Sequence, residues 1–242
     1  RLALQVFLFV CLFVCSFVRS FRHPTPTRTR SLARVMVEVE EEACCPPAAP
    51  IEQEPEIPPV HFLVTGFGKF PGVPANPTEV LVSGLNSKSI ISEAKSHVRL
   101  GSTSVLKVSA KTVCSHLQEL SKLVGGYNES DIIVVVHFGV DVCANSFKLE
   151  RRAFNEANFR LPDEDGFQPR NEPIVSEGEA CSIDTCLHTK LDVAAVVEKL
   201  RGEGFDVQVS HDAGRYVCNY TYFSSLKTFE KRRSLYSLFV HV

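Results

Sequence analysis

Two residues with catalytic potential lie near the end of the chain, a cysteine at Cys218 and a histidine at His241. Cys218 follows a glycine-containing loop at residues 211–217 and stands where this loop becomes a predicted helix. Free backbone N–H groups and the helix dipole at such a position favour a thiolate. A histidine within reach could take up the thiol proton, and a carboxylate could hold that histidine in the right tautomer. The pair predicts nucleophilic catalysis by cysteine, while an inert thiol and a core histidine stay open as alternatives on spacing alone.

The strands that the sequence predicts end in chemically useful residues. Apolar runs predict strands at residues 61–65, 132–138, 206–210 and 235–242. The first run leads into a glycine-rich turn at residues 66–68, and the second ends at His137 and Gly139. Ligands in open α/β sheets bind beyond the carboxyl ends of the strands. If the strands are all parallel, Cys218 and His241 meet in a glycine-lined cleft at one edge of the sheet.

Helical segments alternate with these strands. Asn76 and Pro77 predict the start of one helix, because asparagine is a good N-cap and proline fits the first helical position. Apolar spacing predicts three more helices at residues 112–124, 191–200 and 220–230, and alternation predicts a strand at residues 104–110. This order predicts an α/β domain with a largely parallel sheet that helices cover on both faces.

The domain is expected to begin near residue 60. Residues 2–18 are mostly apolar and precede an arginine-rich tract, a pattern typical of a signal peptide, a signal anchor or an organelle-targeting peptide. The stretch is short for a membrane span, which needs about 20 residues, and we favour a start at Met36, the only methionine. Residues 1–59 are interpreted as a leader followed by an acidic, proline-rich, disordered segment. Residues 60–242 are interpreted as the catalytic domain.

The charge and cysteine content argue against several classes of protein. The formal net charge is −2, yet residues 1–35 contain six arginines and no acidic residue, so the rest of the chain is acidic. An acidic domain argues against nucleic acid as a partner, because phosphate binding needs a basic face. The nine cysteines show no CxxC pair and no zinc-ligand spacing. This pattern argues against a metal site and favours free thiols in a reducing compartment.

Three segments resemble signatures of the pyroglutamyl-peptidase I family of cysteine peptidases, and they stand in the family's order. The nucleophile signature, the glutamate signature and the histidine segment correspond to residues 212–220 (DAGRYVCNY), 149–155 (LERRAFN) and 237–242 (SLFVHV). Residues 64–67 (VTGF), together with Phe70, Asn76 and Pro77, resemble the family's opening strand and loop. The similarity runs from about residue 60 to the end of the chain and looks closest to plant members.

The resemblance implies removal of an N-terminal pyroglutamyl residue from peptides through a thioacyl-enzyme, without a metal or an organic cofactor. Its triad would be Cys218 as nucleophile, His241 as base and Glu150 as the group that orients the histidine. The backbone N–H of Cys218 would help to stabilise the oxyanion. The implied fold is a three-layer α/β/α sandwich with a mixed, mostly parallel sheet, as in phosphorylase- and hydrolase-like proteins.

The resemblance also implies a substrate pocket. Pyroglutamate carries no charge, so its pocket should be apolar with a few backbone hydrogen bonds. Phe67 and Phe70 would wall the ring, and Val140 and Val217 would supply backbone contacts. Core packing is the alternative for Phe67. Arg160 corresponds to an arginine near the family's active site, with a surface salt bridge as its alternative.

The sequence departs from the family at two places. Residues 140–145 (VDVCAN) stand where relatives have glycine-rich sequence, which bears on the shape of the pocket. Relatives also continue beyond the histidine with a proline-led loop and a final helix, whereas this sequence stops one residue after His241. We therefore expect a domain truncated at its C-terminus, either as a fragment of a longer product or as a splice form with impaired activity.

Two rival functions follow from the sequence. The first is a catalytically impaired homologue that acts as a binding or regulatory protein for pyroglutamyl peptides. The second is another hydrolase or phosphorylase on a related α/β sandwich, which the lack of a P-loop or other phosphate motif disfavours. We expect a cytosolic enzyme without a membrane partner, with organelle or secretory targeting as the alternative if residues 1–35 are translated. The sequence does not indicate an oligomeric state.

Overall fold

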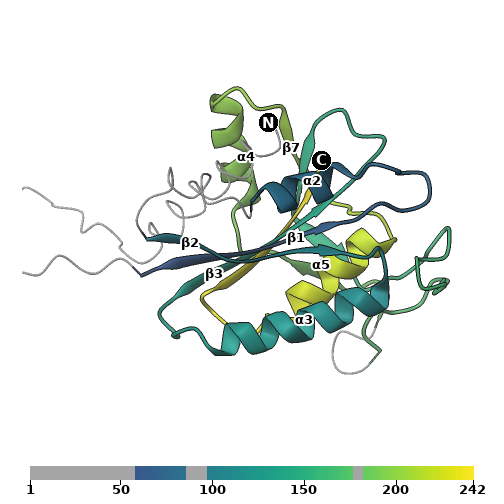
Figure 1. Cartoon of the computed structure of the whole chain (residues 1–242), viewed down its shortest axis with the longest axis horizontal. Helices are drawn as coiled ribbons and strands as arrows, with labels where there is room; N and C mark the ends of the chain where they lie inside the picture. The colour runs from purple at the N-terminus through teal and green to yellow at the C-terminus, as the bar shows by residue number, and fades with distance from the viewer. Residues whose placement is uncertain (1–57, 86–96, 177–181) are drawn as a thin grey trace, which may run out of the picture.

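A six-stranded sheet forms the centre of the molecule in a computed structural model that describes residues 58–85, 97–176 and 182–242 (Figure 1). The strand order is β2-β1-β3-β8-β4-β7. The bounds are β1 Val60–Phe67, β2 Val98–Leu106, β3 Ile132–Gly139, β4 Phe147–Glu150, β7 Val207–Ser210 and β8 Leu235–His241. Strands β2, β1, β3 and β8 are parallel to one another, whereas β4 is antiparallel to β8 and parallel to β7. The sheet is mixed and mostly parallel, as the resemblance implied.

A two-stranded sheet follows directly on β4. It pairs β5 (Arg152–Phe154) with β6 (Cys186–His188) in antiparallel direction. The sequence did not predict β4, β5 or β6, because each has only three or four residues and none shows a clear apolar run. Glu150 is nevertheless the last residue of one of these short strands, β4, and β5 begins two residues later.

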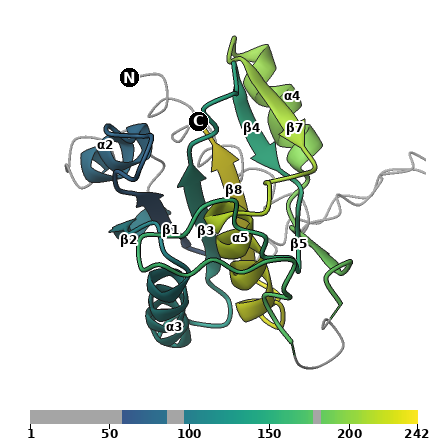
Figure 2. The ribbon, with the colours of Figure 1, turned by 90° about the vertical axis from the view of Figure 1, so that its right-hand side faces the viewer.

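Helices cover both faces of the large sheet, as predicted. Figures 1 and 2 show α2 and α4 on one face and α3 and α5 on the other. Within the described ranges, their bounds are α2 Pro77–Gly84, α3 Ala110–Gly125, α4 Val193–Gly202 and α5 Val217–Thr228. The three layers confirm the predicted α/β/α sandwich.

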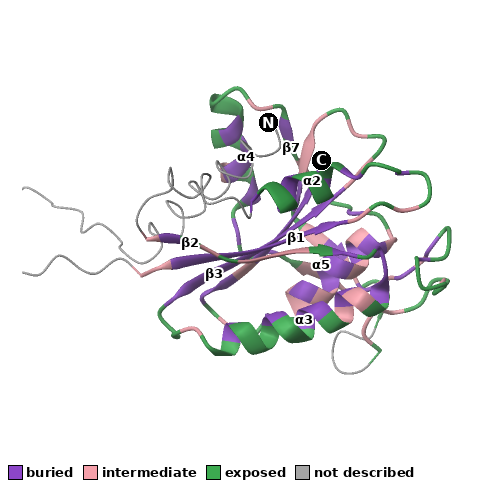
Figure 3. Cartoon of the chain, viewed as in Figure 1, coloured by how far each residue is buried: buried purple, intermediate pink, exposed green. Residues whose placement is uncertain are grey.

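Each face of the sheet has its own hydrophobic core, because neighbouring residues of a strand point to opposite faces. In β3, Val134 and Val136 pack with residues of α2 and α4, whereas Ile133 and Val135 pack with residues of α3 and α5. Every residue of β3 is buried, as its colour in Figure 3 shows. Full burial of one such side chain contributes roughly 1.5–3 kcal/mol. Helices on both faces of the sheet therefore pack against this strand.

Side-chain caps fix the starts of three helices. The side chains of Asn76, Ser109 and Asp192 each accept a hydrogen bond from a backbone N–H in the first turn of α2, α3 and α4. Such a cap contributes about 1 kcal/mol, because it satisfies an N–H that the helix start leaves unpaired. The prediction for Asn76 is confirmed. The start of α5, at Tyr216, has no side-chain cap.

Two predicted boundaries were wrong. The strand expected at residues 104–110 is β2, which ends at Leu106, and α3 begins at Ala110. The reason is the cap at Ser109, which ends the extended segment and starts the helix earlier than apolar spacing indicates. The helix expected at residues 220–230 begins at Val217, so Cys218 lies within its first turn.

The expected convergence of four parallel strand ends was also wrong for one strand. β7 runs antiparallel to β8, because both are neighbours of β4 but pair with it in opposite directions. The last residue of β7, Ser210, is paired with Glu150, which is in turn paired with Phe239, so β7 ends level with the last part of β8.

The expected leader and acidic segment lie outside the described residues, apart from residues 58 and 59. Strand β1 begins at Val60, and the division of the chain near residue 60 stays a prediction. Among the helices of the described ranges, none combines the length and apolar character that a membrane crossing requires.

Candidate active site

His241 and Glu150 meet between β8 and β4. The antiparallel register sets Lys148 opposite His241 and Glu150 opposite Phe239. His241 and Glu150 therefore lie diagonally on the same face of two neighbouring strands, which is within reach of long side chains. His241 Nδ1 lies 2.8 Å from Glu150 Oε1, and the two residues are only 5% and 0% exposed. This bond directs Nδ1 to the carboxylate and leaves Nε2 for a second partner.

The charges around His241 favour its protonated form. Burial lowers the pKa of His241, but the charge and hydrogen bond of Cys218, followed by those of Glu150, outweigh burial and raise the pKa to about 10. The other carboxylate oxygen of Glu150 is buried and has no hydrogen-bond partner in the described part of the chain. The His241 contact is thus what stabilises this carboxylate within the core.

Cys218 faces the carboxyl end of β3. Gly139, the last residue of that strand, is paired with His241. A Cβ atom at Gly139 would lie 3.0 Å from Cys218 Sγ and 2.6 Å from Cζ of Phe239. The glycine therefore gives the sulfur room beside β3 and β8. Cys218 lies close enough to His241 to raise the pKa of the histidine, so the structure brings together Cys218, His241 and Glu150.

Charged side chains hold the loop that leads into α5. Arg215 Nε donates to Glu156 Oε2 at 2.7 Å, and the guanidinium lies 4.2 Å from the centroid of the Phe154 ring. Asp212 accepts hydrogen bonds from the Gly214 N–H and from Arg215. Gly214 has a φ of 79°, a left-handed conformation that costs glycine little. These contacts explain how the loop crosses from the end of β7 to the start of α5.

Two residues that the sequence analysis missed tie α5 to the strand segment of Glu150. The buried side chain of Asn219 accepts from the Phe154 N–H and donates to the carbonyls of Phe154 and Glu156, each at 2.9 Å. The Tyr222 hydroxyl donates to the Glu150 carbonyl at 2.8 Å. The sequence could have pointed to Asn219, because it is a polar residue directly after the cysteine of the nucleophile signature.

A large cavity opens beside these residues. It has a volume of about 1130 Å³, and both Cys218 and His241 line it. Of the predicted pocket residues, three line this cavity: Phe70, Val140 and Arg160. Arg160 is exposed and makes no ion pair with another described residue.

Two predicted pocket residues do not line the cavity with their side chains. Phe67 is 3% exposed and Val217 is 1% exposed, and both belong to the core between the sheet and the helices α3 and α5. Core packing, the alternative considered for Phe67, therefore describes its side chain. The reason is that side chains alternate along a strand, and Phe67 lies with Leu63 on the face of β1 that α3 and α5 cover.

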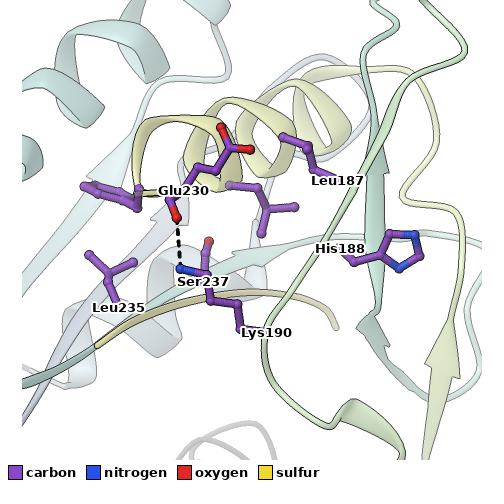
Figure 4. A pocket seen from close by; sticks show the side chains of 8 residues that line it. Leu187, His188, Lys190, Glu230, Leu235 and Ser237 are labelled. Carbon is purple, nitrogen blue, oxygen red and sulfur yellow. Dashed lines mark hydrogen bonds between the residues drawn. The ribbon is translucent and has the colours of Figure 1, made fainter. Parts of the chain in front are cut away.

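A second, much smaller cavity lies at the end of α5 (Figure 4). Its volume is about 100 Å³, whereas sites for small molecules usually measure roughly 300–1,000 Å³. Lys190 crosses it and donates hydrogen bonds to the carbonyls of Glu230 and Arg232 at 3.1 and 2.9 Å. We interpret this cavity as part of the packing that closes the end of the helix.

The described residues contain no group of three or more histidine, cysteine, aspartate or glutamate side chains that could hold a metal ion. Four cysteines in the described ranges are free thiols: Cys114, Cys143, Cys186 and Cys218. Of these, Cys218 is the one that lines the large cavity beside a histidine. The arrangement can therefore support nucleophilic attack by sulfur with proton transfer through imidazole.

Comparisons with known proteins agree with this chemistry. A family model described as "Pyroglutamyl peptidase" matches residues 60–242. The pyrrolidone-carboxylate peptidase of Thermococcus litoralis is 32% identical over 164 residues, which cover 68% of this chain and 67% of that protein. The enzyme of the same name from Vibrio vulnificus is 29% identical over 180 residues, which cover 74% of this chain and 76% of that protein.

Solved structures of similar proteins share the fold. The pyrrolidone carboxyl peptidase from Thermococcus litoralis superimposes with a TM-score of 0.63 at 29% identity, over 75% of this chain and 76% of that one. The pyroglutamyl peptidase I of Bacillus amyloliquefaciens gives a TM-score of 0.63 at 25% identity, over 75% and 81% of the two chains. Since the family model spans every strand and helix described above, this chain belongs to the pyroglutamyl peptidase family.

Proposed function

We propose that this protein removes an N-terminal pyroglutamyl residue from peptides, with Cys218 as the nucleophile. One observation carries the proposal: a buried Glu150–His241 pair, joined at 2.8 Å, lies beside a free cysteine at the wall of a large cavity. This matches the nucleophile, base and orienting group of covalent catalysis. Membership of the pyroglutamyl peptidase family supplies the substrate class.

The proposed reaction has two steps. The Cys218 thiolate attacks the carbonyl carbon that links the pyroglutamyl ring to the next residue, and the carbonyl oxygen becomes an oxyanion. The His241 imidazolium then protonates the leaving amine, the C–N bond breaks, and a thioester remains on Cys218. Water attacks the thioester while His241 takes up its proton, which releases pyroglutamate and the thiolate. Glu150 stabilises the imidazolium throughout.

The start of α5 is suited to the oxyanion. The other three described helices have side-chain caps, whereas α5 has none. Its first N–H groups, including that of Cys218, therefore have no side-chain acceptor to compete with a substrate oxygen. This supports the expectation that the Cys218 N–H stabilises the negative charge that develops during attack.

The cavity fits an uncharged ring followed by a peptide. Phe70 and Val140 supply apolar lining, and the volume exceeds the usual range for a small ligand, roughly 300–1,000 Å³. Two arginines line the cavity. Arg215 is paired with Glu156, whereas Arg160 has no ion-pair partner among the described residues. We propose that Phe70 and Val140 contact the pyroglutamyl group and that the rest of the cavity holds the following residues. Phe67 and Val217 would act from behind, by supporting this wall or through backbone atoms.

The test is release of a fluorogenic amine from its pyroglutamyl amide under reducing conditions. We expect turnover by the parent protein and no turnover by Cys218→Ala. Cys186→Ala, which removes another half-buried thiol, is the matched control and should retain full activity. Prolyl and glutamyl amides should not be cleaved, because each lacks the uncharged lactam. A folded parent that binds a pyroglutamyl peptide without cleaving it would instead support an impaired homologue with a binding role.

We also propose that the enzyme acts in a reducing compartment such as the cytosol. The mechanism needs a free thiolate, which oxidation would inactivate. The four cysteines of the described ranges are all unpaired, as expected for such a compartment.

A further inference from the structure

Four buried polar side chains form a continuous chain of hydrogen bonds across the elements that carry the site. Thr65 Oγ1 lies 2.6 Å from His137 Nδ1, and His137 Nε2 lies 2.9 Å from Ser225 Oγ. Ser225 Oγ in turn lies 2.8 Å from Ser237 Oγ. The chain joins β1, β3, α5 and β8. The mechanism above gives no task to His137, although the sequence places it at the end of the central strand.

These residues are costly to keep in a core. Thr65, His137 and Ser225 are 0% exposed, and Ser237 is 4% exposed. A buried polar group destabilises the fold unless it is hydrogen-bonded, and a network that is fully paired fixes one arrangement of the elements it joins. The neighbouring residues of β3 are valines and isoleucines. Another apolar residue in place of His137 would fill the core without any such requirement.

The network joins the two elements whose separation matters for catalysis. Ser225 lies seven residues after Cys218 in α5, which is two helical turns and thus the same side of the helix. Ser237 lies four residues before His241 in β8, so the two side chains point to the same face of the sheet. The bond between the two serines therefore holds the nucleophile helix against the strand of the base.

His137 is the group that anchors this bond to the sheet. It lies two residues before Gly139, against which Cys218 Sγ packs, and both point to the face that α5 covers. Its ring stacks near Phe239, with centroids 6.3 Å apart, and the Phe239 ring contacts the His241 ring at 4.9 Å. Burial, followed by the nearby charge of His116 on α3, lowers the pKa of His137 to about 3, so its ring is neutral and uses both nitrogens for hydrogen bonds.

We propose that His137 is a positioning residue that, through Ser225 and Ser237, sets the separation between Cys218 and His241. The proposal rests on the proposed roles of these two residues in catalysis. It assigns His137 no contact with substrate. Its effect should appear in the chemical step and in the reactivity of the thiol, with little effect on substrate affinity.

The test compares His137→Leu, His137→Gln and Ser225→Ala with a matched control, His61→Leu. His61 is also a buried histidine, 6% exposed, but it lies on β1 four residues nearer the amino edge than Thr65, roughly 13 Å along the strand. The readouts are kcat and KM for the pyroglutamyl amide, the melting temperature, and the pH profile of Cys218 alkylation by iodoacetamide.

We expect His137→Leu to lower kcat about 10- to 100-fold, the range that a small misplacement of catalytic groups produces, with KM nearly unchanged. The alkylation profile of Cys218 should shift in the same variant. His137→Gln, whose amide can still hydrogen-bond Ser225, should keep more of the parent's kcat than His137→Leu does. Ser225→Ala should also lower kcat, and it provides the test if His137→Leu does not fold. His61→Leu should change the melting temperature alone.

The proposal is overturned if folded His137→Leu or Ser225→Ala keeps the parent's kcat and alkylation profile, since the network is then purely structural. Alkylation needs no substrate, so it tests the network even if the parent does not cleave the amide. A parent that fails in the amide assay while its Cys218 profile still depends on His137 would reject the proposed function and keep the positioning role.

Discussion

The imidazole of His241 lies between the carboxylate of Glu150 and the thiol of Cys218. It receives its orientation from Glu150 at 2.8 Å, and it lies beside the free thiol of Cys218 on the wall of the cavity. Opposing effects set its pKa: burial lowers it, whereas Cys218 and Glu150 raise it to about 10. Because the raising effects win, the histidine can hold its proton over the neutral range, as the proposed general acid must.

Glu150→Gln tests the orienting carboxylate. The substitution keeps the shape but removes the charge, so kcat should fall about 10²- to 10⁴-fold, the range for a disturbed general acid and base. Glu150 also raises the pKa of His241, so the alkaline limb of the kcat/KM profile should move to lower pH. Glu203→Gln, an exposed glutamate paired with Lys199, is the control. An unchanged profile in Glu150→Gln would contradict the assignment.

Gly139→Ala tests the close packing of Cys218 against β3. The added Cβ would meet Phe239 at 2.6 Å and Cys218 Sγ at 3.0 Å. We expect a loss of kcat of about 10-fold or more, because a displaced sulfur attacks poorly, together with a lower melting temperature. Gly125→Ala at the end of α3, where an added Cβ meets nothing within 4 Å, should have neither effect. Full activity in a folded Gly139→Ala variant would contradict this, because it would show that the Cys218 side chain can react from a different position.

Among the helices and strands, α5 carries Cys218 and is held against several strands at once. Asn219 and Tyr222 bind it to the segment of Glu150 and Phe154, and Ser225 binds it to β8. The antiparallel pairing of β4 and β8 then brings Glu150 to His241. The helix and the short strand β4 therefore depend on each other for their position.

Asn219→Leu tests this dependence. The substitution removes three hydrogen bonds of 2.9 Å and leaves the Phe154 and Glu156 backbone groups unpaired in a buried place. We expect the free energy of unfolding to fall by about 3 kcal/mol and kcat to fall as well. Urea unfolding followed by circular dichroism measures the first effect. A variant as stable as the parent would mean that α5 is held mainly by its apolar contacts.

Much of this arrangement could be predicted from local sequence. Long buried strands such as β1 and β3 are mostly apolar, and Asn76 marks the start of α2. The contact between Glu150 and His241 could be predicted only from the resemblance, because it depends on pairing between strands 91 residues apart. Strand β4 is four residues long, and its direction is set by tertiary packing that no periodicity encodes. The same limit explains why the direction of β7 was predicted incorrectly.

At the scale of the whole molecule, histidines make the stability depend on pH in two directions. Burial, as the largest cause, lowers the pKa of His137 to about 3 and also lowers those of His61 and His116. For these groups the unfolded chain binds protons near pH 6.5 and the folded protein does not, so stability falls as pH drops below that value. The raised pKa of His241 acts oppositely, and its contribution is lost as pH rises through about 10.

We therefore expect the free energy of unfolding to decline below about pH 6.5, with His137 alone contributing about 1 kcal/mol per pH unit down to pH 3. Urea titrations of the parent and His137→Gln at pH 7 and pH 5 isolate this contribution. The parent should lose more stability than His137→Gln between pH 7 and pH 5, so the difference between their free energies of unfolding should shift in favour of the variant. Parallel pH dependences in the two proteins would contradict the assignment of a neutral, buried His137.

Detection of the thioacyl-enzyme tests directly whether Cys218 is the nucleophile. The protein is mixed with a pyroglutamyl ester or amide and quenched in acid during turnover, and its intact mass and peptide map are then measured. We expect an adduct with the mass of one pyroglutamyl group on the peptide that contains Cys218, and none in Cys218→Ala. Turnover with an adduct on a different residue, or turnover that persists in Cys218→Ala, would contradict this role of Cys218.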